Sequence, residues 1–150
     1  MNITVLTDIE VKRLIKSVKL CQKQIPNETP LIGRIKDDTP VIDFKNHISY
    51  QLHRYRHPID NSRFSLHIRF KDTNEHLIRI DINNGSHLNP DKTRVAQNHM
   101  HIYHYDKNEN LRKDAYAYNL PDEINDLSSL FTVLESFLTY TNISKNKNNQ

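Results

Sequence analysis

The sequence contains few cysteines, few glycines and no long apolar run. It contains a single cysteine, Cys21, which excludes an internal disulfide and fits a reducing compartment. With only 2 glycines and 26% charged residues, it is not a low-complexity chain. No apolar run approaches the length of a membrane-spanning helix, and the apolar start at residues 1–6 is too short for a signal peptide. We therefore expect a soluble, cytoplasmic protein with no membrane contact.

The charge is mildly basic. The formal net charge is +3, and the 9 histidines add positive charge below about pH 6.5. This permits contact with nucleic acid but does not require it. A length of 150 residues with 36% hydrophobic residues is typical of one domain with one core. We predict a single domain over residues 1–143 and a disordered polar tail over residues 144–150.

Alternating apolar and polar residues predict an antiparallel sheet in the middle of the chain. The clearest alternation lies in Arg63 to Phe70 and His76 to Ile82, and the segment 27–40 is interpreted as a loop or an irregular edge. Further strands are expected over residues 41–44, 47–56 and 98–105, and residues 115–118 are interpreted as a short extended piece. The predicted fold class is α+β: a single antiparallel sheet of four to five strands in a meander, covered on one face by N- and C-terminal helices.

Two amphipathic segments predict those helices. Thr7 and Glu10 form a capping box before an apolar series that Pro26 ends. The lysines of this segment are either a solvated face or a contact surface for phosphates: Lys12, Lys16, Lys19 and Lys23. Asn125 and Asp126 are the predicted cap of the last helix. The predicted core comprises Phe64, Leu66, Ile68, Ile78, Ile80, Leu130, Phe131 and Leu134.

The segment 98–105 carries the densest group of chemically active side chains. Because side chains alternate between the two faces of a strand, one face would carry His99, His101, Tyr103 and Tyr105. Such a face is either a site or a hydrogen-bonded part of the core, in which the histidines contact carboxylates or carbonyls. Asp81 and Asp106 are the candidate carboxylates for the second interpretation.

Two kinds of chemistry are compatible with this strand. A His-x-His pair can bind zinc when a third ligand is present, and His67 or Asp81 would supply it. No second ligand motif supports that site, so we predict no metal site and no cofactor. Metal-independent RNA cleavage needs a base, an acid and a cation. Its catalytic residues would be His99, His101 and Tyr103, with nearby arginines as the cations.

The uncovered sheet face favours a third interpretation, a binding protein. Bases stack on aromatic side chains, and arginines hold phosphates. The predicted partner is nucleic acid or a host nucleoprotein complex. The predicted binding surface comprises Arg54, Tyr55, Arg56, Arg69, Arg79, His67 and Asp81. For Arg54 and Arg56 the alternative is a strand end whose long side chains extend to solvent.

Several segments resemble a family of small uncharacterised proteins from low-GC bacteria, their phages and mobile elements. The resemblance covers about residues 48–143. It rests on the strand 77–82, the segment His87-Leu88-Asn89-Pro90-Asp91-Lys92, the strand His99-Met100-His101-Ile102-Tyr103 and the segment Ala115-Tyr116-Ala117-Tyr118. Lys92 stands where that family has a turn glycine. The arrangement also resembles toxins of toxin–antitoxin pairs. The first resemblance implies a setting of mobile elements and host defence, and it assigns no residue a role.

These observations lead to two functional hypotheses. We predict a small phage or mobile-element protein that binds and inhibits a nucleic-acid-processing host defence complex, as anti-CRISPR proteins do. The alternative is a metal-independent ribonuclease toxin that uses His99 and His101. The binding hypothesis is preferred because no catalytic motif in the sequence is specific.

Overall fold

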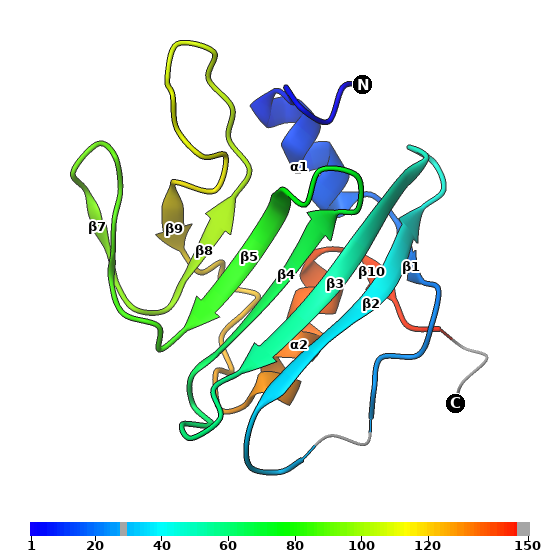
Figure 1. Ribbon diagram of the computed structural model, residues 1–150, viewed down its shortest axis with the longest axis vertical. Helices are drawn as coiled ribbons and strands as arrows, with labels where there is room; N and C mark the ends of the chain where they lie inside the picture. Colours follow the sequence, from blue (N-terminus) through cyan, green and yellow to red (C-terminus); the bar gives the residue numbers. More distant parts are fainter. Residues whose placement is uncertain (28–29, 147–150) are drawn as a thin grey trace.

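A computed structural model describes residues 1–27 and 30–146 of the chain (Figure 1). Its main feature is an eight-stranded sheet with the strand order β10-β1-β2-β3-β4-β5-β8-β9, and β6 and β7 form a small second sheet. The elements are α1 Asp8–Lys16, β1 Lys19–Cys21, β2 Ile35–Asp43, β3 Ile48–Arg56, β4 Phe64–Phe70, β5 His76–Ile82, β6 His87–Leu88, β7 Arg94–Val95, β8 His99–Ile102, β9 Ala117–Asn119, α2 Leu130–Tyr140 and β10 Ile143–Ser144.

The predicted α+β class and antiparallel meander are confirmed. Strands β2, β3, β4, β5, β8 and β9 pair in that order, each antiparallel to the next. The predicted number of strands was too low, because β1 and β10 extend the sheet at one edge and β9 extends it at the other. β1 and β10 also form a parallel pair. Strands of two or three residues are too short to show a readable alternation.

Both helices cover the same face of the sheet (Figure 1). Leu66, Ile68 and Ile78 point toward the helices and are fully buried. The helices contribute Leu14, Leu130, Val133 and Phe137 to the same hydrophobic cluster. Every residue of the predicted core is buried except Phe131, which is partly buried. No helix within the described parts of the chain is long and apolar enough to cross a membrane.

Helix α1 is shorter than the apolar spacing predicted. The capping box of Thr7 and Glu10 is present, but the helix ends at Lys16. The chain then enters β1, where it pairs with both β2 and β10. Lys19 is buried there, and its ammonium donates to three backbone carbonyl oxygens at 2.7–2.9 Å. The predicted lysine stripe is therefore interrupted, because pairing with distant strands overrides the local helical pattern.

Strand β2 corrects the prediction of a loop over residues 27–40. It begins at Ile35, and its acidic residues do not break it because they face cations on neighbouring strands. Asp37 pairs with Arg54 of β3, and Asp38 pairs with Arg69 of β4. These cross-strand ion pairs supply partners for polar residues that alone favour a loop.

The last helix and the end of the chain differ in detail from the prediction. Helix α2 is capped by Ser129, whose hydroxyl accepts from the backbone N–H of Thr132, and not by Asn125 or Asp126. Ser144 lies in β10, although it was assigned to a disordered tail. The rest of that predicted tail from residue 147 onward lies outside the described residues.

Candidate metal centre

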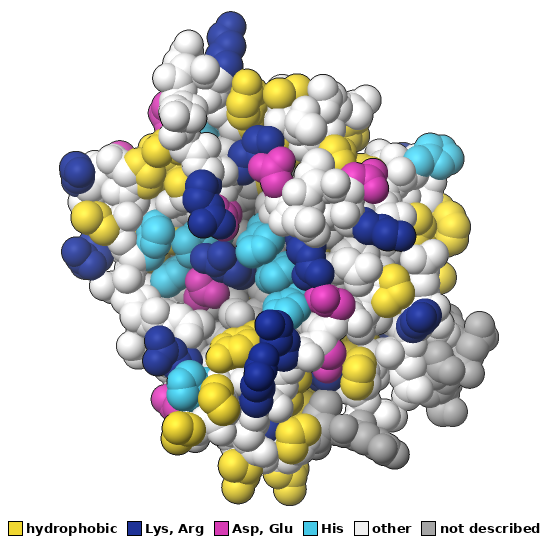
Figure 2. Space-filling view, viewed as in Figure 1, with side chains coloured by type: hydrophobic (Ala, Val, Ile, Leu, Met, Phe, Trp, Pro, Cys, Tyr) yellow, Lys and Arg dark blue, Asp and Glu magenta, His cyan; other side chains and the backbone are white. Residues whose placement is uncertain are grey.

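The sheet face opposite the helices carries a concentration of histidine and charged side chains. In the space-filling view, histidines and Arg or Lys side chains gather over the centre of this face (Figure 2). The strand register explains the gathering. One row across the sheet runs Asp38, His53, His67, Arg79 and His101, with each residue opposite the next. The predicted alternation of β4, β5 and β8 therefore sends His67, Arg79 and His101 to the same face.

Two histidines converge on one carboxylate in the neighbouring row. Asp81 of β5 lies directly opposite His99 of β8. The Nε2 atoms of His99 and His101 each lie 3.4 Å from the same oxygen, Oδ2 of Asp81. The exposed fractions are 8% for Asp81 and 3% for each histidine. Within residues 1–27 and 30–146, this is the one group of three potential metal ligands whose donor atoms lie within 4.8 Å of one another.

The outer nitrogen of each imidazole is held by the backbone. His99 Nδ1 lies 2.7 Å from the carbonyl oxygen of Ala96, and His101 Nδ1 lies 2.8 Å from that of Asp114. A carbonyl oxygen can only accept, so each Nδ1 carries a proton and donates it. In a neutral ring Nε2 is then unprotonated, with its lone pair available. Both available nitrogens are the ones near Asp81.

The electrostatics of the group favour added positive charge. Burial by itself would raise the pKa of Asp81, but contacts from His101 and His99 together with the charge of Arg79 lower it below its usual range. The contact with Asp81 raises the pKa of His99, against the effect of burial. An ionised carboxylate thus lies between two imidazoles, and it stabilises either a proton or a cation there.

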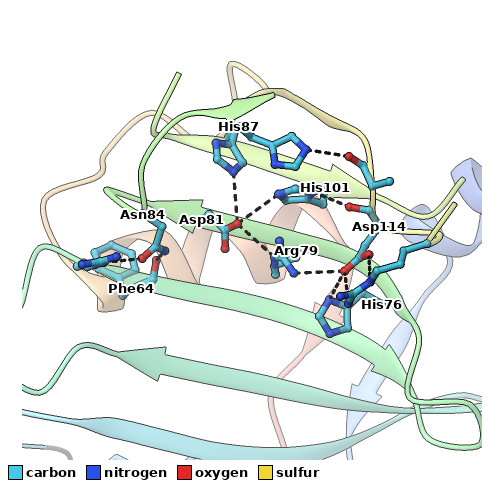
Figure 3. A network of polar contacts seen from close by, with 12 residues as sticks. Phe64, His76, Arg79, Asp81, Asn84, His87, His101 and Asp114 are labelled. Atoms are coloured by element: carbon cyan, nitrogen blue, oxygen red, sulfur yellow. Dashed lines mark hydrogen bonds and ion pairs between the residues drawn. The ribbon is translucent and has the colours of Figure 1, made fainter. Parts of the chain in front are cut away.

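Arg79 and Asp114 surround this group (Figure 3). Arg79 Nε lies 3.2 Å from Oδ2 of Asp81, and its Nη1 lies 3.4 Å from a carboxylate oxygen of Asp114. Asp114 also accepts from His101 through its backbone carbonyl. Arg79 therefore orients the carboxylate, and residue 114 orients both Arg79 and His101. Such outer partners are typical of metal sites.

The second candidate ligand from the sequence, His67, belongs to a different group. Its ring stacks between His53 and His76, with centroid separations of 4.8 and 4.0 Å. Its Nε2 accepts from Arg69 at 3.1 Å. Of the two carboxylates considered for the histidine pair, Asp81 contacts both rings, whereas Asp106 accepts from the backbone N–H of Asn108 in a loop.

The predicted arginine surface is divided between the two faces. Arg54 and Arg56 point toward the helices and are 2% and 3% exposed, so they do not share a surface with Arg69 and Arg79. Arg54 forms a two-point contact with Asp37. Arg56 donates to the carbonyl oxygens of Gly33 and Pro30. Arg54 and Arg56 face the core because they lie in register with the apolar residues Leu66 and Phe64 of β4.

The remaining predicted residues also occupy separate positions. Tyr55 lies opposite Ser65 on the uncovered face. Arg69 already has a carboxylate partner, because it pairs with Asp38 through two contacts of 2.9 Å. Tyr103 follows the end of β8 and lies in the core, where its hydroxyl donates to the carbonyl of Ile3. It therefore does not join His99 and His101 as the strand pattern predicted.

Sequence reasoning missed His87, His76 and Asp114. His87 lies on β6, and its ring centroid is 4.8 Å from that of His101 and 5.9 Å from that of His99. His76 and Asp114 line a small polar cavity of about 160 Å³ beside this group. No periodic pattern marks these residues, because His87 lies on a strand of two residues outside the main sheet, Asp114 lies in a loop, and His76 lies at a bulge between β4 and β5.

Comparisons with known proteins bear on the predicted resemblance. No curated protein and no solved structure shows significant similarity to this chain. A family model described as "Family of unknown function (DUF6978)" matches residues 6–143. The predicted likeness to an uncharacterised family is confirmed at this level, and its mobile-element setting and the likeness to toxins stay predictions. Since the match spans most of the sequence, the chain belongs to this family of unknown function.

Proposed function

We propose that this protein binds one divalent transition-metal ion at His99, His101 and Asp81. One observation carries the proposal: each histidine Nε2 lies 3.4 Å from the same carboxylate oxygen. Ligand atoms that hold zinc at about 2.0–2.1 Å in a tetrahedron are about 3.3–3.4 Å apart. The two Nε2–Oδ2 distances therefore match two edges of a tetrahedral site.

The same spacing fits a direct hydrogen bond less well. N–H···O hydrogen bonds have donor–acceptor distances of about 2.7–3.2 Å. Both Nδ1 atoms already donate to backbone carbonyls, so in neutral rings the Nε2 lone pairs of His99 and His101 face an ionised carboxylate. Lone pairs that face one another need a proton or a cation between them. A metal ion between the three atoms satisfies all of them at once.

The ligand types favour some ions over others. Imidazole nitrogens suit zinc, cobalt, nickel and iron, whereas calcium and magnesium prefer oxygen ligands. Asp81, Asp114 and Arg79 together carry a net charge of −1 when both histidines are neutral, and a divalent cation changes this to +1.

The proposal replaces the prediction from sequence that the protein has no metal site, and the other functional hypotheses from sequence remain predictions. Binding to nucleic acid or to a defence complex stays a prediction, but Arg69 and Arg79 have carboxylate partners that a ligand would have to displace. The ribonuclease hypothesis needs two accessible imidazoles, and His99 and His101 are 3% exposed. The metal site needs neither free arginines nor exposed histidines, so the geometry supports it best.

The test is metal content and cobalt binding of protein purified without a histidine tag. Stripped wild-type protein should take up one Co²⁺ per chain. His101→Asn should abolish this uptake, because its amide can still donate to the carbonyl of Asp114 but cannot supply Nε2. His104→Asn is the matched control, since His104 contacts Asp8 at the surface and lies outside the group. Absence of uptake by folded wild-type protein, or equal uptake by His101→Asn, would overturn the proposal.

A further inference from the structure

We infer that His87 supplies a fourth ligand to this ion, so that the metal fastens the β6–β7 segment onto the sheet. The inference rests on the proposed metal site and adds a closed coordination sphere and a structural role. The position of His87 supports this inference. Figure 3 shows His87 and His101 beside Asp81, and His87 reaches them from the segment between β5 and β8.

Two of the three ring separations match those of imidazoles on a single ion. The ring centroids of His99 and His101 are 5.0 Å apart, and those of His87 lie 4.8 Å from His101 and 5.9 Å from His99. Imidazoles bound to one tetrahedral ion at about 2.0–2.1 Å have ring centroids about 5 Å apart. The separations of His101 from His99 and from His87 match this value, whereas His87 would have to move closer to His99 to share the ion.

Each of the three rings also has one nitrogen held by a backbone carbonyl. His87 Nε2 lies 2.8 Å from the carbonyl oxygen of Ala115, so it carries the proton and donates. The nitrogen left to coordinate is Nδ1. His99 and His101 repeat this arrangement with the opposite nitrogens. Metal-bound histidines nearly always donate their second ring N–H in this way, which fixes the ring and raises its basicity.

The β6–β7 segment has few contacts of its own that would hold it on the sheet. Its two strands have two residues each, and a hairpin of this size is marginal in water. Leu88 is 47% exposed, and Val95 is the one apolar side chain of these two strands that is buried. The other anchor is Asn89, whose side chain exchanges two hydrogen bonds with the backbone of Ala117. A metal bond at His87 would add a further anchor two residues from Asn89.

The experiment uses CoCl₂ with the full chain and the variant His87→Gln. Glutamine keeps a donor for the carbonyl of Ala115 but has no imidazole Nδ1. We expect His87→Gln to bind Co²⁺ at least about tenfold more weakly than wild type, since even outer partners of a metal ligand contribute that much. The visible cobalt spectrum should lose the intense bands of four-coordinate Co²⁺. His104→Gln should match wild type in both.

Hydrogen exchange gives a second measurement. In wild type, Zn²⁺ should slow the exchange of backbone amides in residues 86–95, and in His87→Gln it should not. If the variant does not fold, the ¹⁵N resonance of His87 Nδ1 in wild type answers the question, because coordination by Zn²⁺ must shift it.

The outcomes separate the two proposals. Equal affinity and an unchanged spectrum in His87→Gln, or an unshifted His87 resonance, would overturn the fourth ligand and leave the site of His99, His101 and Asp81 standing. Failure of wild type to bind Co²⁺ would overturn both.

Discussion

The stacked histidines on the uncovered face make stability depend on pH. Burial, reinforced by nearby positive groups, lowers the pKa of His67 to about 2. Burial also lowers the pKa of His76 to about 4, reinforced by Arg79 and opposed by Asp114. Their ring centroids are 4.0 Å apart, and the side chain of His76 is 21% exposed. Both rings therefore stay neutral in the folded protein at a pH where an exposed histidine is protonated.

The sign and size of the effect follow from linkage. In the unfolded chain each histidine takes up a proton near pH 6.5, while the folded rings do not until about pH 4 or below. Stability therefore falls as the pH drops below about 6.5, by about 1.4 kcal/mol per pH unit for each ring. From pH 6.5 to pH 5 the two rings together cost about 3 kcal/mol, a large part of a typical stability of about 5–15 kcal/mol.

His99 has the opposite effect on how stability depends on pH. The contact with Asp81 raises the pKa of His99 in the folded state. Its contribution is present below about pH 6.5 and is lost as the pH rises through the raised pKa. It therefore offsets part of the loss on acidification, and the wild-type slope should be smaller than that expected from His67 and His76 alone.

The assay compares wild type with His67→Gln by urea unfolding, followed by circular dichroism, at pH 5, 5.5, 6 and 7.5 with EDTA present. Glutamine can still accept the hydrogen bond from Arg69 but does not titrate. Below pH 6, the dependence of the unfolding free energy on pH should be smaller in the variant by about 1.4 kcal/mol per unit. His47→Gln controls for the loss of a histidine outside the stack. An equal slope in wild type and His67→Gln would refute the argument.

Further predictions concern the folded core, each measured as a change in the free energy of urea unfolding. Leu66→Ala should cost about 2–5 kcal/mol because Leu66 is fully buried, and a loss below 1 kcal/mol would contradict its place in the core. Arg54→Met should cost about 3 kcal/mol because it removes both contacts to Asp37, and Arg54→Lys should restore little since lysine lacks the planar fork. Lys19→Met should cost about 1–3 kcal/mol by leaving three carbonyls without a donor, and an unchanged midpoint would show that water replaces the ammonium. Tyr103→Phe should cost about 1–2 kcal/mol through two lost hydrogen bonds to the N-terminal segment, and a neutral result would argue against that contact.

The predictability of each element followed the range of the interactions that form it. Strands β4 and β5 were predicted almost to the residue, because half-buried strands show their period of two in the sequence itself. Strand β1 was predicted as helix, since its neighbours β2 and β10 come from distant segments. The pairing energy of those segments outweighs a local apolar pattern, and a single sequence does not display it.

The candidate site, too, could be predicted from the sequence only in part. The alternation of β8 put His99 and His101 on one face, and Asp81 was one of two considered third ligands. The convergence of these three on one point depends on the register in which Asp81 lies opposite His99. A shift of one residue would move Asp81 to the other face. His87 could not be predicted, because nothing local states that β6–β7 folds back over β8.

The sequence by itself determined the α+β class, the antiparallel meander and the face on which the histidine pair lies, because each depends on the spacing of residues within one segment. Only the tertiary structure decided that Arg54 and Arg56 face the core, that Tyr103 leaves the site, and that a carboxylate and a third imidazole join the pair. These outcomes depend on register and on packing between segments far apart in the chain. The free energy that selects them comes from contacts that do not exist until the sheet has formed.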